Sequence, residues 1–590
     1  MRATAALLVG LLFTPTIAAR AAAPPLATLA FVDVTVVPMD RAATLAHQTV
    51  LVGEGRIAAV GPVDGVPIPP TARRIDGRGR FLIPGLTDTH VHLISSTELP
   101  LYLANGVTTV FNLDGRPAHL RWRARVARGE LPGPTIFTSG PIFASAHTPA
   151  EAVRMVDQQA AAGYDAVKIY NQVSAAEYPA LIAEAKKRHL LLMGHVAREP
   201  GFETTVRLGQ SIAHLEELTY SFFQRPGGDG DLAAIDFDES RIPLVAAMLA
   251  TSGVSVTATL SMFRDIVRQA TALPRYLQNP ELRYLPAWLR AHLEPGANKY
   301  DGRYPPETVA VLRRSLAFQR LLVRALADAG VPLMTGTDTT TIGPVSGFSL
   351  HEELEELVAS GLTPWQALRA STVNPARYFG VATERGTIEA GKRADLVLLS
   401  ADPLAAIANS RAVAGVVAAG RYYDAPQLRH LVDAIATRYA DELTFVVQAL
   451  ATDPPRASAY LADNDPSGGL TSAALARLID KWGVARLRKT VAAMRRSAAD
   501  GDAVGEDAMN TLGYDLLGRH QTAQAIAVLA ANVEDFPRSA NALDSLAEAY
   551  AKTGAVDRAV QLYAQALDLD ARYVNAPFAR RFLVEHQHNP

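Results

Sequence analysis

Residues 81–93 read Phe81-Leu-Ile-Pro-Gly-Leu-Thr-Asp-Thr-His-Val-His-Leu93, an apolar run that ends in His90 and His92. In a β-strand, residues i and i+2 point to the same face, so this strand presents both imidazoles side by side. Neutral histidine is the commonest metal ligand, and two imidazoles at a strand end suit a first-row metal ion. The pair alone is weak evidence, because any strand end can carry two histidines. A metal site therefore requires matching ligands at other strand ends.

More segments with strand character follow this one, and helical patterns separate most of them. The predicted strands span residues 88–93, 107–112, 135–139, 166–170, 190–196, 211–214, 254–260 and 331–337. Helical patterns include residues 151–162, 175–188 and 307–329. Alternating strands and helices indicate a parallel sheet, and eight such repeats over about 250–300 residues are typical of a (β/α)8 TIM-like barrel. The prediction is an α/β fold with this barrel at residues 84–382.

Short segments rich in β-branched residues lie on both sides of the predicted barrel. They cover residues 24–83 and 383–425, and Gly, Asp and Pro interrupt them as they do in short strands. The tripeptide Gly53-Glu54-Gly55 has the composition of a hairpin turn. We expect the two segments to pair into one small β-sandwich domain beside the barrel.

The chain from residue 426 to residue 590 is predicted to be helical. Residues 510–539 and 544–573 carry an internal repeat, with apolar and small residues at matching places 34 residues apart. In period and in small-residue placement this tail resembles a tetratricopeptide (TPR) repeat, whose units must stack to bury their apolar faces. Such a tail could join copies of the chain into a homo-oligomer or bind a protein partner. A helical bundle without a binding role fits the same pattern.

The N-terminal residues differ from the rest of the chain. Met1-Arg-Ala-Thr4 carries one basic side chain, residues 5–17 are apolar, and small residues surround Arg20. This pattern predicts a secretory signal peptide over residues 1–23, and hence an exported protein, periplasmic or secreted. The apolar stretch is too short for a comfortable transmembrane helix, and an uncleaved anchor is the alternative. After cleavage we expect no membrane association.

Composition limits the possible partners and ligands. The chain has 57 basic and 59 acidic residues and a net charge of −2, so no basic surplus points to nucleic acid. It contains no cysteine, which excludes disulfides and thiolate ligands. Any metal must therefore be held by histidine, carboxylate or a less usual group.

The carboxyl ends of the predicted strands gather candidate ligands at one mouth, because the functional residues of a (β/α)8 barrel sit there. They are His90, His92, Lys168, His195, His214 and Asp338. Lys168 is the informative member, since lysine is rarely buried unless it is paired. Burial can lower the pKa of a lysine enough to make it a nucleophilic amine. Reaction with CO2 would then give a carbamate whose two oxygens can bridge two metal ions; a Schiff-base lysine is the alternative.

The motifs around these residues are Gly85-Leu-Thr-Asp-Thr-His-Val-His-Leu93, Val167-Lys-Ile-Tyr170, Gly194-His195, Ala213-His-Leu-Glu216 and Thr337-Asp338. As a set they resemble the amidohydrolase superfamily, and most of all its imidazolonepropionase-like and zinc-prolidase-like members. The resemblance covers residues 26–423 and does not include the helical tail. Imidazolonepropionase typically binds one metal and lacks the lysine carbamate, so Lys168 favours the prolidase-like branch.

The resemblance implies a role for each candidate ligand. His90 and His92 would bind the more buried metal. His195 and His214 would bind a second metal, and Lys168, as N6-carboxylysine, would bridge the two. Asp338 would touch the first metal and act as the general base. Members of the superfamily are often dizinc, so we expect two Zn²⁺ ions or other divalent ions.

The resemblance also implies a reaction: hydrolysis of C–N bonds in small substrates such as dipeptides or N-acyl amino acids. A hydroxide bridging the metals would attack the carbonyl, and Asp338 would take its proton. Tyr170, one step nearer the mouth than Lys168, and His147, after the third strand, are candidate substrate contacts. Alternatives are a hydrolase of cyclic amides, carbamates or esters, a mononuclear deaminase, and a non-enzymatic protein that works through its tail.

Overall fold

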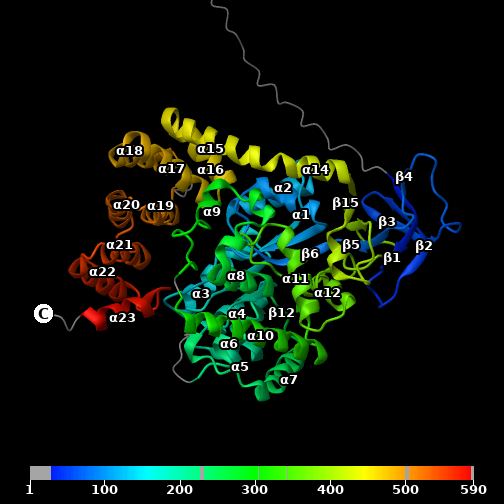
Figure 1. Ribbon diagram of the computed structural model, residues 1–590, viewed down its shortest axis with the longest axis horizontal. Helices are drawn as coiled ribbons and strands as arrows, with labels where there is room; N and C mark the ends of the chain where they lie inside the picture. Colours follow the sequence, from blue (N-terminus) through cyan, green and yellow to red (C-terminus); the bar gives the residue numbers. More distant parts are fainter. Residues whose placement is uncertain (1–27, 226–231, 303, 342, 498–503, 587–590) are drawn as a thin grey trace, which may run out of the picture.

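The computed structural model describes residues 28–225, 232–302, 304–341, 343–497 and 504–586. A central unit of strands and helices lies between a flanking sheet and a helical tail (Figure 1). The predicted signal peptide, residues 1–23, lies outside the described residues. Within those residues, no helix combines the length and the apolar character that crossing a membrane requires.

Segments from both sides of the central unit hydrogen-bond into one mixed sheet of eight strands. These strands are β1 (Leu29–Val36), β2 (Leu45–Gly53), β3 (Arg56–Pro62), β4 (Arg73–Asp76), β5 (Phe81–Pro84), β14 (Leu396–Leu399), β15 (Val413–Ala418) and β16 (Arg421–Asp424). β5 pairs antiparallel with β14, which joins the two segments as expected. All the strands belong to one hydrogen-bonded sheet, in which β1 pairs with β2, β4 and β5. That this sheet folds into the two layers of a sandwich stays a prediction.

The predicted hairpin turn joins β2 to β3. Glu54 and Gly55 both have positive φ, 51° and 76°. Two successive residues with positive φ are what a two-residue type I′ loop requires, and the twist of that loop matches the twist of the strands it connects. Glycine adopts this conformation at no steric cost, which explains its place at the second position.

All the predicted strands of the central unit are present, most of them shorter than expected. They are β6 (Leu86–Val91), β7 (Val107–Asn112), β8 (Thr135–Thr138), β9 (Ala166–Ile169), β10 (Leu191–Gly194), β11 (Ser211–Ala213), β12 (Val256–Thr257) and β13 (Leu333–Met334). Strands β6 to β8 form one parallel sheet, and β9 to β13 form another. Isolated parallel bridges join Val91 to Thr339 and Ser139 to Ala166, where the two sheets meet. Every residue of β6, β7 and β9 is buried, as in sheets covered on both faces.

Helices connect these strands and surround them (Figure 1). They are α1 (Leu99–Ala104), α2 (Pro117–Ala127), α3 (Pro149–Ala162), α4 (Tyr178–Lys187), α5 (Gly201–Arg207), α6 (Glu216–Ser221), α7 (Ile242–Ser252), α8 (Leu260–Tyr276), α9 (Ala287–Ala291), α10 (Pro306–Asp328), α11 (Phe348–Ala359), α12 (Pro364–Ala370) and α13 (Val373–Tyr378). Local signals set their ends. In α3, the Thr148 side chain caps the first turn, proline occupies that turn, and Gly163 ends the helix with φ 88°.

The tail is helical throughout its described part, as predicted. Its helices are α14 (Ala425–Asp433), α15 (Ile435–Thr452), α16 (Pro454–Asn464), α17 (Gly469–Trp482), α18 (Val484–Ser497), α19 (Glu506–Gly518), α20 (Thr522–Asp535), α21 (Ala540–Lys552), α22 (Val556–Leu569) and α23 (Ala576–His586). The hairpin of α19 and α20 is followed by the hairpin of α21 and α22, whose helices start 34 residues later. This spacing equals the predicted period; that the hairpins are TPR units stays a prediction.

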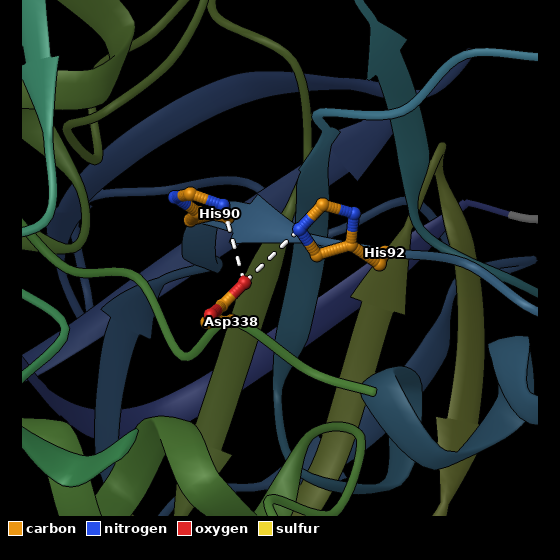
Figure 2. Close-up of side chains that lie close together, drawn as sticks. All are labelled: His90, His92 and Asp338. Carbon is orange, nitrogen blue, oxygen red and sulfur yellow. Dashed lines mark ion pairs between the residues drawn. The ribbon is translucent and has the colours of Figure 1, made fainter. Parts of the chain in front are cut away.

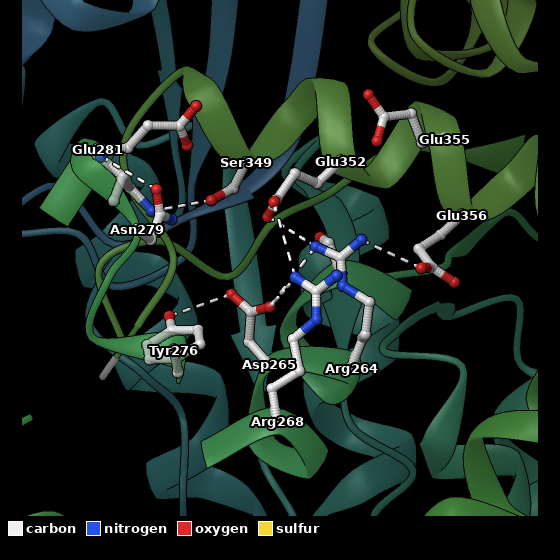
Figure 3. Close-up of polar contacts among 12 residues, drawn as sticks. Arg264, Asp265, Arg268, Tyr276, Asn279, Glu281, Ser349, Glu352, Glu355 and Glu356 are labelled. Atoms are coloured by element: carbon white, nitrogen blue, oxygen red, sulfur yellow. Dashed lines mark hydrogen bonds and ion pairs between the residues drawn. The ribbon is translucent and has the colours of Figure 1, made fainter. Parts of the chain in front are cut away.

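A buried charge network fixes α8 to α11 (Figure 3). Arg264 of α8 lies 2.7 Å from Glu352 and 3.1 Å from Glu356, which are both on α11. Glu356 also pairs with Arg320 of α10 at 2.7 Å. Because α8 follows β12 and α11 follows β13, the network holds together the helices that leave the last two strands of the central unit.

Candidate metal centre

Three side chains at the carboxyl ends of β6 and β13 converge on one point (Figure 2). His90 is part of β6, His92 follows that strand, and Asp338 lies in the segment after β13. The Nε2 atoms of His90 and His92 lie 3.3 and 3.0 Å from Asp338 Oδ1. The Asp338 backbone N–H donates to the carbonyl of His90 at 2.8 Å, which fixes the segment against the strand. The structure therefore brings these three predicted ligands together.

The donor atoms of this group fit a divalent metal ion. One ligand atom from each residue lies within 4.8 Å of the others. Asp338 Oδ1 is buried, and no described residue meets it with hydrogen-bond geometry although two imidazole nitrogens approach it. A cation would satisfy this arrangement, because two imidazole nitrogens face one carboxylate oxygen without a hydrogen bond between them. Nitrogen and oxygen donors without thiolate suit Zn²⁺ and similar ions.

Lys168 of β9 lies beside this group. Its side chain is 1% exposed, and its Nζ lies 3.4 Å from His90 Nε2. Burial lowers the pKa of Lys168 to about 8, against the opposing effect of the nearby carboxylates of Asp338 and Glu217. A part of the amine is therefore neutral close to pH 7, and the neutral amine is the form that reacts with CO2.

The other predicted ligands extend the cluster through ring contacts. The ring of His214 lies 4.2 Å from that of His90, and the ring of His195 lies 5.0 Å from that of His214. Tyr170 continues the series at 4.3 Å from His195. The structure thus gathers all the predicted ligands and Tyr170. His147 is exposed on the loop after β8, and no contact recorded among the described residues joins it to the cluster.

Burial also sets the protonation of the other cluster members. It lowers the pKa of His195 and holds the pKa values of His90 and His214 well below the usual one, so the rings are neutral and able to bind metal. Burial alone would raise the pKa of Asp338, but His214 and other neighbours lower it to about 2. At neutral pH the imidazoles of His90, His195 and His214 are therefore neutral, and the Asp338 carboxylate is ionised.

Asp88 supports the first histidine, although the sequence did not single it out. Its carboxylate accepts hydrogen bonds from the backbone N–H of His90 at 3.2 Å, from the backbone N–H of Thr337 at 3.1 Å and from the Thr337 hydroxyl at 2.7 Å. It thereby ties β6 to the segment that carries Asp338. Burial raises the pKa of Asp88 to about 7 despite these bonds. One signal was available: Asp88 stands two residues before His90, on the same face of the strand.

Glu217 and Thr259 support two other histidines and were also missed. Glu217 Oε1 lies 2.9 Å from Nδ1 of His195, and Thr259 Oγ1 lies 3.1 Å from Nδ1 of His214. A hydrogen-bond partner at Nδ1, as Thr259 is for His214, orients the ring and leaves Nε2 for a ligand. Glu217 lies at ion-pair distance from His195 Nδ1 without hydrogen-bond geometry. No periodicity relates Glu217 to His195 or Thr259 to His214, so only the folded structure reveals these pairs.

The backbone is strained at three residues of this site. His214, Thr259 and Asp338 have φ values of 71°, 52° and 54°, in the left-handed region that residues other than glycine rarely adopt. Each lies just beyond the end of a strand. Strain of this kind persists where the surrounding structure imposes it, and it concentrates at functional sites.

Side chains of metal-ligand type cluster at the carboxyl ends of parallel strands, which is the arrangement of a class of α/β proteins with metal sites. Comparison with known proteins assigns the chain to a family. The model of the Amidohydrolase family matches residues 81–422. The chain belongs to the amidohydrolase family, which confirms the predicted resemblance. All the clustered residues lie inside the matched region, whereas α14 to α23 lie outside it.

The relatives carry different activities in their names. An adenine deaminase of Paracoccus denitrificans is 23% identical over 374 residues, which cover 60% of this chain and 51% of that protein. An imidazolonepropionase of Idiomarina loihiensis is 24% identical over 368 residues, with coverages of 60% and 85%. A solved structure of a candidate prolidase from Bifidobacterium longum aligns at a TM-score of 0.51 and 25% identity, covering 70% of this chain and 100% of that one. The chain spans about half the length of the adenine deaminases it matches.

Proposed function

We propose that this protein is a metal-dependent hydrolase that cleaves C–N bonds in small substrates, such as dipeptides or N-acyl amino acids. The observation that carries the proposal is Lys168, buried at 1% exposure with its Nζ 3.4 Å from His90 Nε2. A buried amine beside metal ligands is costly as a cation, and its carbamate would supply two further oxygen ligands. The likeness to the candidate prolidase of Bifidobacterium longum supports this substrate class.

The proposal assigns two ligand groups and a bridge between them. They are His90, His92 and Asp338 for one divalent ion, His195 and His214 for a second, and Lys168 as N6-carboxylysine between the two. Zn²⁺ suits this set of nitrogen and oxygen donors. When bound, such ions polarise a carbonyl and make water acidic enough to act as a nucleophile at neutral pH.

The side chains of the chain itself would position the substrate and move the proton. The Asp338 carboxylate would accept the proton of the attacking water and return it to the leaving amine; its pKa of about 2 keeps it ionised at neutral pH. Burial raises the pKa of Tyr170, so its hydroxyl remains a donor for the substrate or for the developing oxyanion. His147, on the exposed loop after β8, is placed to meet only those parts of a substrate that extend from the mouth.

The organisation of the chain is part of the proposal. Residues 84–382 form one closed (β/α)8 barrel, and the bridges between Val91 and Thr339 and between Ser139 and Ala166 support its closure. Residues 24–83 and 383–425 form the flanking domain, and residues 426–590 form the TPR-like tail. Residues 1–23 direct export to the periplasm or the medium. Residues 1–23 would be removed in the process, and N-terminal sequencing of the exported protein would refute this cleavage if the chain began at Met1.

A deaminase is the second candidate. The match to proteins named adenine deaminase favours it, because those proteins release an amine nitrogen by hydrolysis of a C–N bond in a ring substituent. Lys168 argues against it, since deaminases of this superfamily usually bind one metal and lack the lysine bridge. The nitrogen-containing product distinguishes the two candidates, because a deaminase releases ammonia and a dipeptidase releases an amino acid.

A substrate panel tests the proposal. The full-length protein, supplied with Zn²⁺, receives dipeptides, N-acyl amino acids, a cyclic amide, a carbamate, an ester and adenine. We expect free amino acids from the first two classes. Asp338→Asn should lower kcat by about 100-fold or more, since it removes the general base; the control Asp328→Asn, at the exposed end of α10, should not. Ammonia from adenine alone would support the deaminase, and no product from any compound would contradict the enzyme assignment.

A further inference from the structure

The helical tail packs against loops that leave the carboxyl ends of the central strands, the end at which the candidate metal centre lies. After β6, Thr97 of the short helix η1 (Ser96–Glu98) donates a hydrogen bond to Glu442 of α15. After β7, the indole N–H of Trp122 in α2 donates to the carbonyl of Asp463 in α16 at 2.8 Å. Trp122 is 1% exposed and belongs to the hydrophobic core of the central unit, so this hydrogen bond joins the tail to a fixed side chain. The tail is therefore docked on the central unit over several loops.

One of these contacts involves a buried carboxylate. Arg572, between α22 and α23, has its Nη2 3.1 Å from Oε1 of Glu177, whose side chain is 2% exposed. Oε2 of Glu177 accepts a hydrogen bond from the backbone N–H of Ala146 at 2.7 Å, and the Ser174 hydroxyl donates to Oε1 at 2.5 Å. Ala146 belongs to the loop after β8, and Ser174 to the loop after β9. Glu177 thus joins the far end of the tail to two loops of the mouth.

The loop after β8 holds the end of the strand that carries Lys168. The backbone N–H of Phe143 donates to the carbonyl of Lys168 at 2.8 Å, and the backbone N–H of Tyr170 donates to the carbonyl of Phe143 at 3.0 Å. Phe143 is fully buried, so this loop segment is packed in place. A continuous set of contacts therefore runs from the tail, through Glu177 and this loop, to Tyr170.

We infer that the helical tail is the outer part of the catalytic mouth, and that Arg572 is a positioning residue that acts through Glu177 on the loop beside Tyr170. The inference rests on the proposed function, because Tyr170 is a substrate contact only if the site is a hydrolase. Without Arg572, the buried carboxylate would lose its cationic partner, which is the costly state for a buried charge. Glu177 would then turn toward water and release Ala146 and Ser174. Substrate binding should weaken while the metal ligands keep their places.

The test compares Arg572→Ala, the conservative Arg572→Lys and the control Arg558→Ala in the full-length protein. Arg558 of α22 contacts Tyr550 within the tail and has the same charge. For the amide that the protein hydrolyses, we expect KM to rise about tenfold or more in Arg572→Ala, the effect of losing a hydrogen bond to a charged group. The kcat and the bound metal should stay within about twofold of wild type. Arg572→Lys should recover part of the loss, and Arg558→Ala should match wild type.

Hydrogen exchange gives a readout that does not require turnover. Amides in residues 143–147 and 170–177 should exchange faster in Arg572→Ala than in wild type or in Arg558→Ala. If no compound of the panel is hydrolysed, the proposed function fails, whereas the exchange still reports on the Arg572–Glu177 ion pair. Unchanged exchange in both loops, or a KM equal to that of wild type, would overturn the inference. A parallel loss of kcat and bound metal would also overturn it.

Discussion

Burial controls the proton affinity of the individual residues in the candidate metal centre. The imidazoles of His90 and His214 stay neutral, and Asp338 stays ionised, over the neutral range. Lys168 differs, because burial brings its pKa to about 8, close to neutral pH. Only the neutral amine reacts with CO2, and the amine loses its proton as pH rises. Carboxylation of Lys168 should therefore become faster with increasing pH.

We expect the metal-free protein to regain metal faster at pH 8 than at pH 7 when dissolved CO2 is held constant. With a pKa near 8, the neutral fraction of Lys168 rises from about 10% to about 50% over this interval. The rate of Zn²⁺ uptake should rise about fivefold in proportion. In Lys168→Ala, uptake should show no dependence on CO2. A wild-type rate that does not respond to CO2 at either pH would contradict carboxylation.

The clustering of the candidate ligands could be expected from the sequence, whereas the residues that contact and orient them could not. His90 and His92 follow from the two-residue period of a strand, and Lys168 stands out because a lysine interrupts an apolar strand. Glu217 approaches the ring of His195, which follows a different strand, so this contact depends on how the strands pair. Local patterns contain no information on such contacts, and chemically similar glutamates elsewhere in the chain serve as solvated surface groups.

For the strands, the positions in the sequence could be predicted, whereas the pairing of one strand with another could not. The prediction for β7 agrees with Val107–Asn112 residue for residue, because periodicity and flanking turn residues are local signals. The flanking segments do pair, as predicted, and β1 accepts three partners, a branching that the sequence did not reveal. Which strand edges meet is decided by contacts between residues far apart in the chain, and a sandwich and a single sheet share the same alternation of side chains.

The charge network between α8 and α11 makes a prediction at this level. Glu356, with 7% of its side chain exposed, pairs with Arg264 and Arg320. Glu356→Gln should lower the free energy of unfolding by about 1.5–3 kcal/mol, the usual contribution of hydrogen bonds to charged groups. Glu355→Gln on the same helix should cost less than about 1 kcal/mol, since Glu355 is 37% exposed in its pair with Arg411. Equal costs in urea unfolding would show that burial of the network contributes nothing.

At the level of the whole molecule, the tail belongs with the central unit. The repeat period predicted helical hairpins, and the structure has hairpins at that spacing. The sequence carried no signal that Arg572 would meet Glu177, or that the Trp122 indole would donate a hydrogen bond to α16, because each contact joins residues several hundred positions apart in the chain. Docking on the mouth would give the tail a role that needs no protein partner. That the tail binds a partner or a second copy of the chain stays a prediction.

Bound metal per chain tests the central claim most directly. We expect about two equivalents in the wild type and in the control Lys187→Ala, whose lysine is an exposed residue of α4 paired with Glu184, and a marked loss in Lys168→Ala. The physical reason is that the carbamate of Lys168 would supply the oxygens of the bridge between the two ions. The full metal content in Lys168→Ala would contradict the bridge. A wild type with no tightly bound metal and no hydrolysis restored by added metal would contradict the enzyme itself.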